Sequence, residues 1–141
     1  MNILVIDAHG GGLGKQIVTA LRKSFPDIDI TAVGTNSTAS SVMLKAGASH
    51  AATGENAVIV NCRKADIIIG PLAIVIADSL FGEITPDMAL AVAQSNAKRI
   101  LIPFNQCDNI VVGISNYNPS FLIQNAIDEV AKTLSPPSAE G

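Results

Sequence analysis

Four glycines within five residues follow the apolar run at the start of the chain, in the segment Asp7-Ala8-His9-Gly10-Gly11-Gly12-Leu13-Gly14-Lys15. Each glycine adds conformational entropy to the unfolded chain, and what a glycine cluster permits is close approach of the backbone to another group. The N–H groups at a helix N-terminus, together with the helix dipole, bind phosphate and other anions. The segment therefore predicts an anion site, with a purely structural glycine turn as the alternative. The candidate contacts are Gly10, Gly11, Gly12, Leu13, Gly14 and Lys15.

Lys15 supports the anion site, because a cation in the first turn of a helix opposes the helix dipole unless an anion is bound beside it. The P-loop pattern G-x-x-x-x-G-K-[ST] matches Gly14 and Lys15. However, His9 stands at its first glycine, and Gln16 replaces the hydroxyl that holds magnesium. Phosphoryl transfer is therefore the weakest of the functions considered.

Two dinucleotide patterns also fit the loop in part. The pattern G-x-G-x-x-G finds Gly10 and Gly12, but Lys15 stands where its third glycine is expected. The short-chain dehydrogenase pattern G-x-x-x-G-x-G fits Gly12 and Gly14, with Ala8 at its first glycine. The chain also lacks the tyrosine-lysine pair of those enzymes, since Tyr117 is its only tyrosine.

The end of the second predicted strand, Gly34-Thr35-Asn36-Ser37-Thr38, contains no acidic residue. Dinucleotide sites usually have one about 20 residues beyond the loop, where it binds the adenosine ribose, or an arginine for NADP. The hydroxyls and the amide here either contact a ribose or phosphate or cap the next helix. NAD(P) or another nucleotide is thus the candidate cofactor, with Gly34, Thr35 and Asn36 as candidate contacts.

The C-terminal ends of parallel strands meet at one edge of a sheet, so the residues that end the strands are predicted to converge near the glycine loop. Asp7 is expected to hold the loop by accepting N–H groups, with metal binding as the alternative. His9 is either a proton donor and acceptor or an exposed loop residue. Glu55 either contacts a ligand or begins a helix. Glu83 and Asp87 flank a cap and are expected at a helix start, with a catalytic role as the alternative. The converging strand ends are Asp7, 34–36, Gly70, Pro71 and Asn105, of which Gly70 and Pro71 are further candidate contacts.

Short apolar runs alternate with segments of helical spacing, which is typical of repeated βα units around a parallel sheet. Strands are predicted at 2–7, 28–34, 49–52, 65–70, 98–103 and 109–114, and helices at 15–25, 36–46, about 54–64, 85–95 and 120–134. The pattern predicts an α/β fold: a single-domain, doubly wound (Rossmann-like), mostly parallel sheet of five or six strands with helices on both faces. This domain covers 1–134, and 135–141 form a flexible tail.

Length and composition exclude several classes of protein. With 141 residues, of which 48% are hydrophobic and 15% charged, the chain can bury the core of one domain. Nine basic residues against 12 acidic ones, without a basic run, argue against nucleic acid as a partner. Cys62 and Cys107 form no zinc motif, so no metal is expected, and two free thiols are typical of the cytoplasm.

The most apolar stretch, 67–77, has eleven residues, fewer than the roughly 20 that span a bilayer. No signal peptide is recognised, so we expect a cytoplasmic protein that does not bind a membrane. Within this stretch, 71–77 is apolar on every side. It is predicted either to form the interface of a homodimer or to be buried within its own domain.

Several different short motifs are spread along nearly the whole chain up to the tail. They are Val5-Ile6-Asp7 before the glycine loop, Gly34-Thr35-Asn36, Ala52-Thr53-Gly54-Glu55-Asn56, Ile69-Gly70-Pro71, Gly82-Glu83-Ile84-Thr85-Pro86 and Ile102-Pro103. In these motifs the chain resembles a family of short bacterial Rossmann-like proteins catalogued only as a domain of unknown function. The loop of that family often has glutamine where this chain has His9. The resemblance implies the fold and brings no established activity.

These observations predict a protein that binds a nucleotide or dinucleotide, a phosphate-containing small molecule, at the loop from Gly10 to Lys15. Whether it is an enzyme, and with what reaction, stays open. The alternative is a non-enzymatic sensor or homo-oligomeric assembly protein in which the same loop detects a nucleotide or shapes an oligomer.

Overall fold

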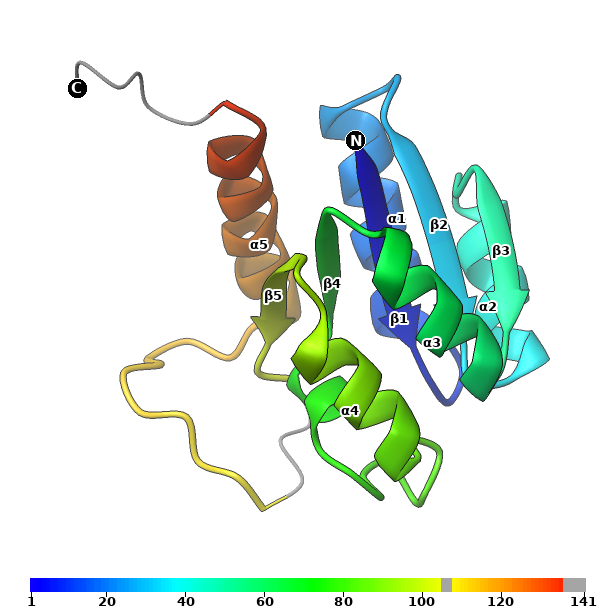
Figure 1. The fold of residues 1–141 in the computed structure, drawn as a ribbon. Helices are drawn as coiled ribbons and strands as arrows, with labels where there is room; N and C mark the ends of the chain where they lie inside the picture. Colours follow the sequence, from blue (N-terminus) through cyan, green and yellow to red (C-terminus); the bar gives the residue numbers. More distant parts are fainter. Residues whose placement is uncertain (105–107, 136–141) are drawn as a thin grey trace.

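Five parallel strands form one sheet at the centre of the molecule, in the order β3-β2-β1-β4-β5 (Figure 1). The structure is a computed structural model that describes residues 1–104 and 108–135. The strands are β1 (Asn2–Asp7), β2 (Asp29–Gly34), β3 (His50–Thr53), β4 (Ile67–Pro71) and β5 (Lys98–Ile102). The helices are α1 (Gly12–Ser24), α2 (Ser37–Lys45), α3 (Glu55–Lys64), α4 (Pro86–Gln94) and α5 (Pro119–Leu134), with a short 3-10 helix η1 (Leu72–Val75).

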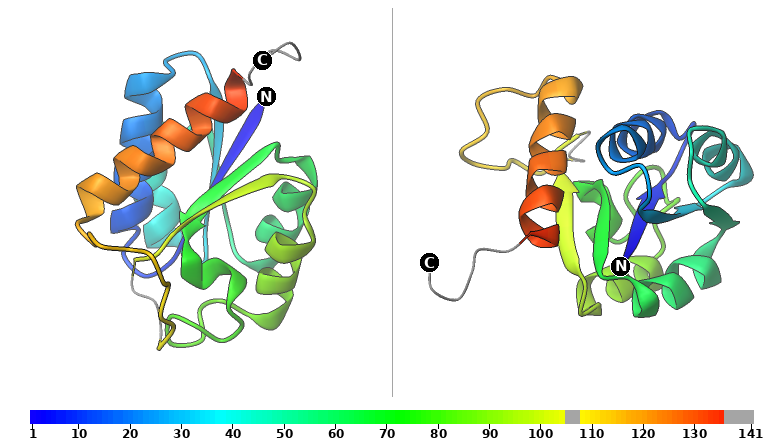
Figure 2. Two further views of the ribbon diagram at one scale, coloured as in Figure 1. Left: turned by 90° about the vertical axis from the view of Figure 1, so that its left-hand side faces the viewer. Right: turned by 90° about the horizontal axis from the view of Figure 1, so that it is seen from above.

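The helices cover both faces of the sheet, as the view from above shows (Figure 2). Alternate side chains of the buried strand β1 point to opposite faces, with Ile3 and Val5 packing under α1, α2 and α5. Leu4 and Ile6 pack on the other side, under α3 and α4. The α/β doubly wound fold predicted from the sequence is confirmed.

The strand order reverses between β1 and β4. The chain runs outward from β1 through β2 to β3, then returns along α3 to place β4 on the other side of β1. In open parallel sheets, ligands bind in the crevice beyond the C-terminal ends of the two strands at this point. The fold thus directs attention to the loops that follow Asp7 and Pro71.

The predicted strand at 109–114 is wrong. These residues form no strand, and the chain over 108–118 extends away from the sheet before α5 (Figure 1). Ile110 and Val112 supplied the alternating apolar pattern, but they are 89% and 88% exposed and pair with no strand. Gly113 has a φ of 89°, which interrupts any extended run. Asn105, Cys107 and most of the predicted tail lie outside the described residues.

The apolar segment 71–77 is accounted for by burial within its own domain. Ala73 and Ile74, both in η1, are 0% and 1% exposed and belong to the core on the α4 side of the sheet. Pro71 is also buried, while Leu72 and Val75 are half-buried. Of the two predictions for this segment, the structure agrees with burial in the chain itself.

Helix α1 begins at Gly12, three residues earlier than predicted, because the glycine run itself forms its first turn. A Cβ atom on Gly14 would lie 2.9 Å from the Cβ of Asp7 and 2.5 Å from the Sδ of Met43. A side chain at this position would therefore push α1 away from β1 and α2. At Gly12 in the same turn, a Cβ would meet nothing within 4 Å.

We expect Gly14→Ala to lower the free energy of unfolding by about 1–3 kcal/mol, because an added methyl group has no space at this contact. The matched control is Gly12→Ala, which should leave the free energy of unfolding unchanged or raise it by up to about 1 kcal/mol, because alanine reduces the entropy of the unfolded chain. Urea denaturation measures both. Equal stability of the two variants would contradict the packing role of Gly14.

Candidate functional site

A cavity of about 200 Å³ lies at the C-terminal ends of β1 and β4, where the strand order reverses. It brings together the predicted contacts Gly10 to Leu13 and Pro71, which are distant in sequence. The residues that line it are Asp7, Ala8, His9, Gly10, Gly11, Gly12, Leu13, Gln16, Pro71, Leu80 and Phe104. We call it the loop cavity.

The four loop glycines fall into two pairs. Gly14 is required by the α1–β1 contact, and Gly11 has a φ of 74°, where an added Cβ would lie only 2.5 Å from Val42 Cγ2. Packing does not require glycine at positions 10 and 12, because a Cβ on Gly10 or Gly12 would meet nothing within 4 Å. Both line the loop cavity, so the space left by their missing side chains faces the candidate site.

The packing of Gly14 also fixes how the dinucleotide pattern G-x-G-x-x-G lies on the loop. The third glycine of that pattern permits close contact between helix and strand, and Gly14 has this role here. Counting back, Gly11 takes the second position and His9 the first. His9 has a φ of 53°, a left-handed conformation that glycine adopts more readily. The match predicted from the sequence, which began at Gly10, was therefore shifted by one residue toward the C-terminus.

Asp7 holds the loop, as predicted. Its Oδ1 accepts a hydrogen bond from the N–H of Ala8 at 2.8 Å, and its Oδ2 accepts one from the N–H of Gly14 at 2.6 Å. Asp7 is 6% exposed, and this burial raises the pKa of its carboxyl, although the two hydrogen bonds act in the opposite direction. Across the described residues, the N–H groups of Gly12 and Leu13 form no hydrogen bond, and they remain available at the N-terminus of α1.

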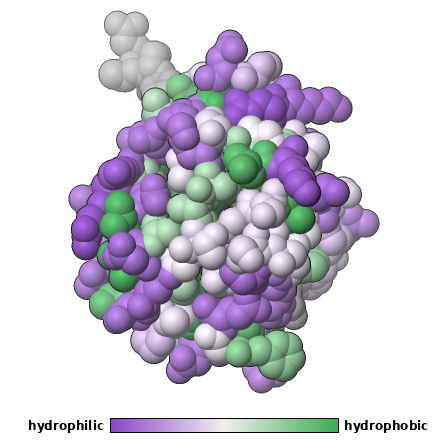
Figure 3. Space-filling model, turned by 90° about the vertical axis from the view of Figure 1, so that its right-hand side faces the viewer, coloured by the Kyte–Doolittle hydropathy of each residue, from purple (hydrophilic) through white to green (hydrophobic). Residues whose placement is uncertain are grey.

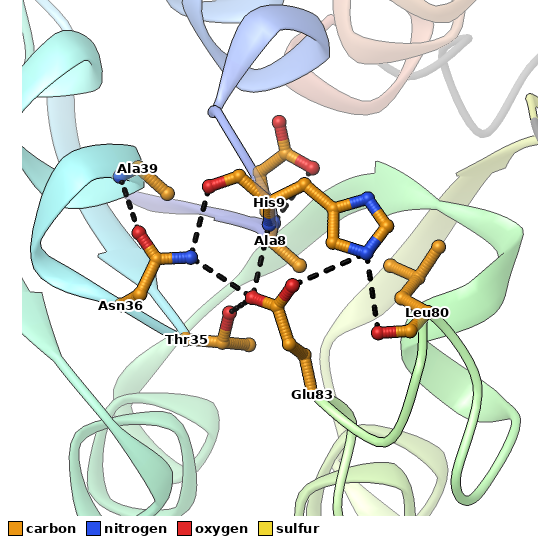
Figure 4. A network of polar contacts seen from close by, with 8 residues as sticks. Ala8, His9, Thr35, Asn36, Ala39, Leu80 and Glu83 are labelled. Carbon is orange, nitrogen blue, oxygen red and sulfur yellow. Dashed lines mark hydrogen bonds and ion pairs between the residues drawn. The ribbon is translucent and has the colours of Figure 1, made fainter.

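Glu83 connects the loops that follow β1, β2 and β4 (Figure 4). Its Oε1 accepts hydrogen bonds from the His9 N–H at 3.0 Å, the Thr35 hydroxyl at 2.7 Å and the Asn36 amide at 2.9 Å. Its Oε2 lies 3.1 Å from His9 Nε2. Glu83 lies two residues before Thr85, which caps α4, but its carboxylate bonds to two other loops and not to the start of this helix.

Glu83 stays ionised at neutral pH. Partial burial acts to raise its pKa, but the hydrogen bonds from Thr35, His9 and Asn36, together with the nearby His9 ring, outweigh it and lower the pKa. His9 Nε2 also lies 3.2 Å from the carbonyl oxygen of Leu80. The other ring nitrogen of His9 points away from both acceptors (Figure 4).

The remaining candidate contacts lie outside the loop cavity. Lys15 is exposed and borders a separate hollow of about 690 Å³ between α1 and α5, which it shares with Lys23. A Cβ on Gly34 would lie 2.6 Å from Ser40 N, and one on Gly70 would lie 2.5 Å from Ile6 O, so both glycines are needed for packing. Thr35 and Asn36 contact Glu83.

The other side chains considered for chemistry have structural partners. Glu55 begins α3 and accepts a hydrogen bond from Thr85, the residue that caps α4. Cys62 is buried, and burial raises the pKa of its thiol to about 11, so it does not form a thiolate at neutral pH. Over 1–104 and 108–135, no group of three His, Cys, Asp or Glu side chains could hold a metal ion. No helix in these ranges is long and apolar enough to cross a membrane.

The strand order, the crevice at its reversal and the glycine-rich first βα loop define a Rossmann-like protein. The family model of a domain of unknown function, DUF3842, matches residues 2–135, and the chain belongs to this family. The resemblance noted in the sequence is thereby confirmed. No curated protein matches the sequence.

Among solved structures, the chain is similar to a dodecameric FMN-dependent UbiX-like decarboxylase from Escherichia coli O157:H7. The two share 17% sequence identity with a TM-score of 0.46, over 99% of this chain and 87% of the other. At that TM-score the likeness carries no argument about function.

The lowered pKa of Glu83 gives a pH dependence with a defined sign. We expect Glu83→Gln to lower the free energy of unfolding at pH 7 by about 1 kcal/mol, because an amide accepts weaker hydrogen bonds than a carboxylate. The advantage of the native residue is fully present above pH 4.5, the ordinary value, and is lost as the pH falls through the lowered pKa. Urea denaturation of both proteins between pH 7 and pH 3 measures this. A difference that does not shrink below pH 4.5 would contradict the assignment.

Proposed function

We propose that the loop cavity binds a phosphate-bearing small molecule of the nucleotide class, with the phosphate on the N–H groups of Gly12 and Leu13. The observation that carries the proposal is that these N–H groups have no hydrogen-bond partner among the described residues, at the N-terminus of α1 and within a cavity at the reversal of strand order. The helix dipole favours an anion at this position. The space beside Gly10 and Gly12 would be occupied by the ligand.

The opposite wall of the loop cavity suits the organic part of such a ligand. Pro71, Leu80 and Phe104 provide apolar surface there, while the N–H groups provide polar contacts. A mostly apolar cavity with a few directed polar groups is typical of small-molecule sites. A base or a sugar attached to the phosphate would lie against these three side chains.

The charges near the loop cavity limit how strongly it attracts anions. The carboxylate of Asp7 lines it and that of Glu83 lies directly behind His9, whereas Lys15 points elsewhere. Phosphate recognition would therefore depend on N–H groups and the helix dipole. This differs from a P-loop, in which a lysine reaches the phosphates.

We expect inorganic phosphate, AMP or another phosphate compound to raise the melting temperature of the wild-type protein. A ligand at a hundred times its dissociation constant adds about 2.7 kcal/mol of stability. Gly12→Ala should remove this shift while keeping the native fold, because its methyl group occupies the space intended for the ligand.

The matched control is Lys15→Ala, which should retain the shift because Lys15 lies outside the loop cavity. Differential scanning fluorimetry measures all three proteins with the same compounds. The proposal fails when no phosphate compound shifts the wild type, or when Gly12→Ala and the wild type respond equally.

Self-association is a second candidate property, favoured by large apolar side chains exposed after β5. Ile110 and Val112 are almost fully exposed on a segment that extends from the body of the molecule (Figures 1 and 2). Tyr117 and Phe121, before and at the start of α5, are 46% and 48% exposed. The view toward the β3 side mixes polar and weakly apolar residues without a broad hydrophobic patch on its described surface (Figure 3). Contiguous exposed apolar surface often marks a protein interface. We propose that a homodimer forms through 110–121 rather than through 71–77.

We expect the wild-type protein to sediment as a dimer at micromolar concentration and the double variant Ile110→Asp with Val112→Asp to sediment as a monomer. Both side chains are exposed, so the substitutions should leave the melting temperature unchanged. Analytical ultracentrifugation measures the masses. A monomeric wild type would rule out this interface.

A further inference from the structure

The position of Glu83 bears on which ligands the site can accept. In dinucleotide-binding folds, an acidic residue at the end of the second strand binds the hydroxyls of the adenosine ribose, close to the first glycine of the loop. Here that strand ends in Thr35 and Asn36, with His9 at the first glycine. A carboxylate reaches the same place from the loop between β4 and α4.

Most of the hydrogen-bonding capacity of the Glu83 carboxylate is already used within the protein. A carboxylate has about four lone-pair sites for hydrogen bonds. Oε1 already accepts from three donors, and Oε2 faces the His9 ring. These contacts also use the donors of Thr35 and Asn36 that could otherwise bind a ligand. Glu83 therefore stands at the ribose position with its Oε1 fully engaged by Thr35, Asn36 and His9.

The loop that carries Glu83 is held in a strained conformation. Asp78, Leu80 and Phe81 have φ values of 65°, 56° and 57°, a left-handed region that costs energy for residues other than glycine. The loop is closed by a hydrogen bond from the Asp78 N–H to the Ile84 carbonyl at 2.7 Å, and the Ser79 hydroxyl donates to Ala73 O at 2.7 Å. Such strain persists only where surrounding contacts fix it, and the contacts of Glu83 are among those that do.

His9 lines the loop cavity, whereas Thr35 and Asn36 do not. Glu83 does not line the loop cavity, which extends instead toward Pro71, Leu80 and Phe104. Its volume of about 200 Å³ is below the roughly 300–1,000 Å³ of pockets that enclose drug-sized ligands. A phosphate with one small attached unit fits this space.

We propose that Glu83 determines specificity by closing the β2 side of the site, so that the loop cavity takes a ligand with a single phosphate-bearing unit and excludes dinucleotides. The inference rests on the proposed function. The shared chemistry of its ligands is a monophosphate on one sugar, supplied either by a nucleoside monophosphate or by a free sugar phosphate.

The test is isothermal titration calorimetry with AMP, ribose 5-phosphate and NAD+. The wild type should bind AMP or ribose 5-phosphate at least tenfold more tightly than NAD+, and the stronger of the two identifies the source of the monophosphate. Glu83→Ala should bind NAD+ at least tenfold more tightly than the wild type does, because it opens the ribose position and frees its donors. Glu83→Gln is the matched control, since its amide has nearly the same volume and should keep NAD+ excluded.

Equal affinity of the wild type for AMP and NAD+ would overturn the proposal without any variant, so the test does not depend on the folding of Glu83→Ala. A folded Glu83→Ala, checked by circular dichroism, whose affinity for NAD+ is unchanged would also overturn it. Both results leave the proposed function intact when monophosphates still bind and Gly12→Ala removes that binding. Failure of every phosphate compound to bind the wild type would instead reject the proposed function, and the inference with it.

Discussion

The two hydrogen bonds that the buried carboxylate of Asp7 accepts fix the geometry on which the rest of the site depends. They join the last residue of β1 to the first turn of α1, and the lack of a side chain at Gly14 lets the helix approach closely enough for them to form. Asp7 also supplies a negative group at the positive end of the helix dipole. Asp7 thus takes up the N–H group of Gly14, while the N–H groups of Gly12 and Leu13 have no hydrogen-bond partner among the described residues.

This internal anion distinguishes the loop from phosphate-binding loops that rely on a lysine. A buried carboxylate next to the helix N-terminus competes electrostatically with any anion from solution, and its raised pKa reflects the cost of keeping the charge there. A ligand held mainly by backbone N–H groups is recognised through geometry more than through charge. Such a site favours an anion whose organic part makes additional contacts with Pro71, Leu80 and Phe104.

Much of the fold could be predicted from the sequence, because short stretches of neighbouring residues indicate where its helices and strands lie. The unbroken β-branched run at 67–69 indicated a strand buried on both faces, and Thr85, Pro86 and Asp87 indicated the start of α4. The orientation of Lys15 could also be predicted from the sequence. Lys15, Thr19 and Lys23 are spaced four residues apart, so they lie on one face of α1. The buried Ile17 and Leu21 lie on the opposite face. That spacing argues that Lys15 points away from the sheet, whereas the charge argument alone had placed it at the ligand.

The role of Glu83 could not be predicted, because its partners lie 47 to 74 residues away along the chain and only the sheet brings them together. The strand expected at 109–114 failed for a related reason. Alternation shows that a segment can form a strand, but only a neighbouring strand with free hydrogen-bonding groups makes it one. Ile110 and Val112 belong to an alternating apolar pattern, but no strand lies beside them among the described residues.

Glu83 also has a dynamic consequence. Its carboxylate is carried by the loop after β4 and accepts hydrogen bonds from the loops after β1 and β2. These shared contacts make the three loops a single cooperative unit. Local opening of any one of them would break contacts shared with the other two, so the loops gain or lose order together. The rim of the crevice would accordingly exist in two collective states, closed and open, instead of many independent ones.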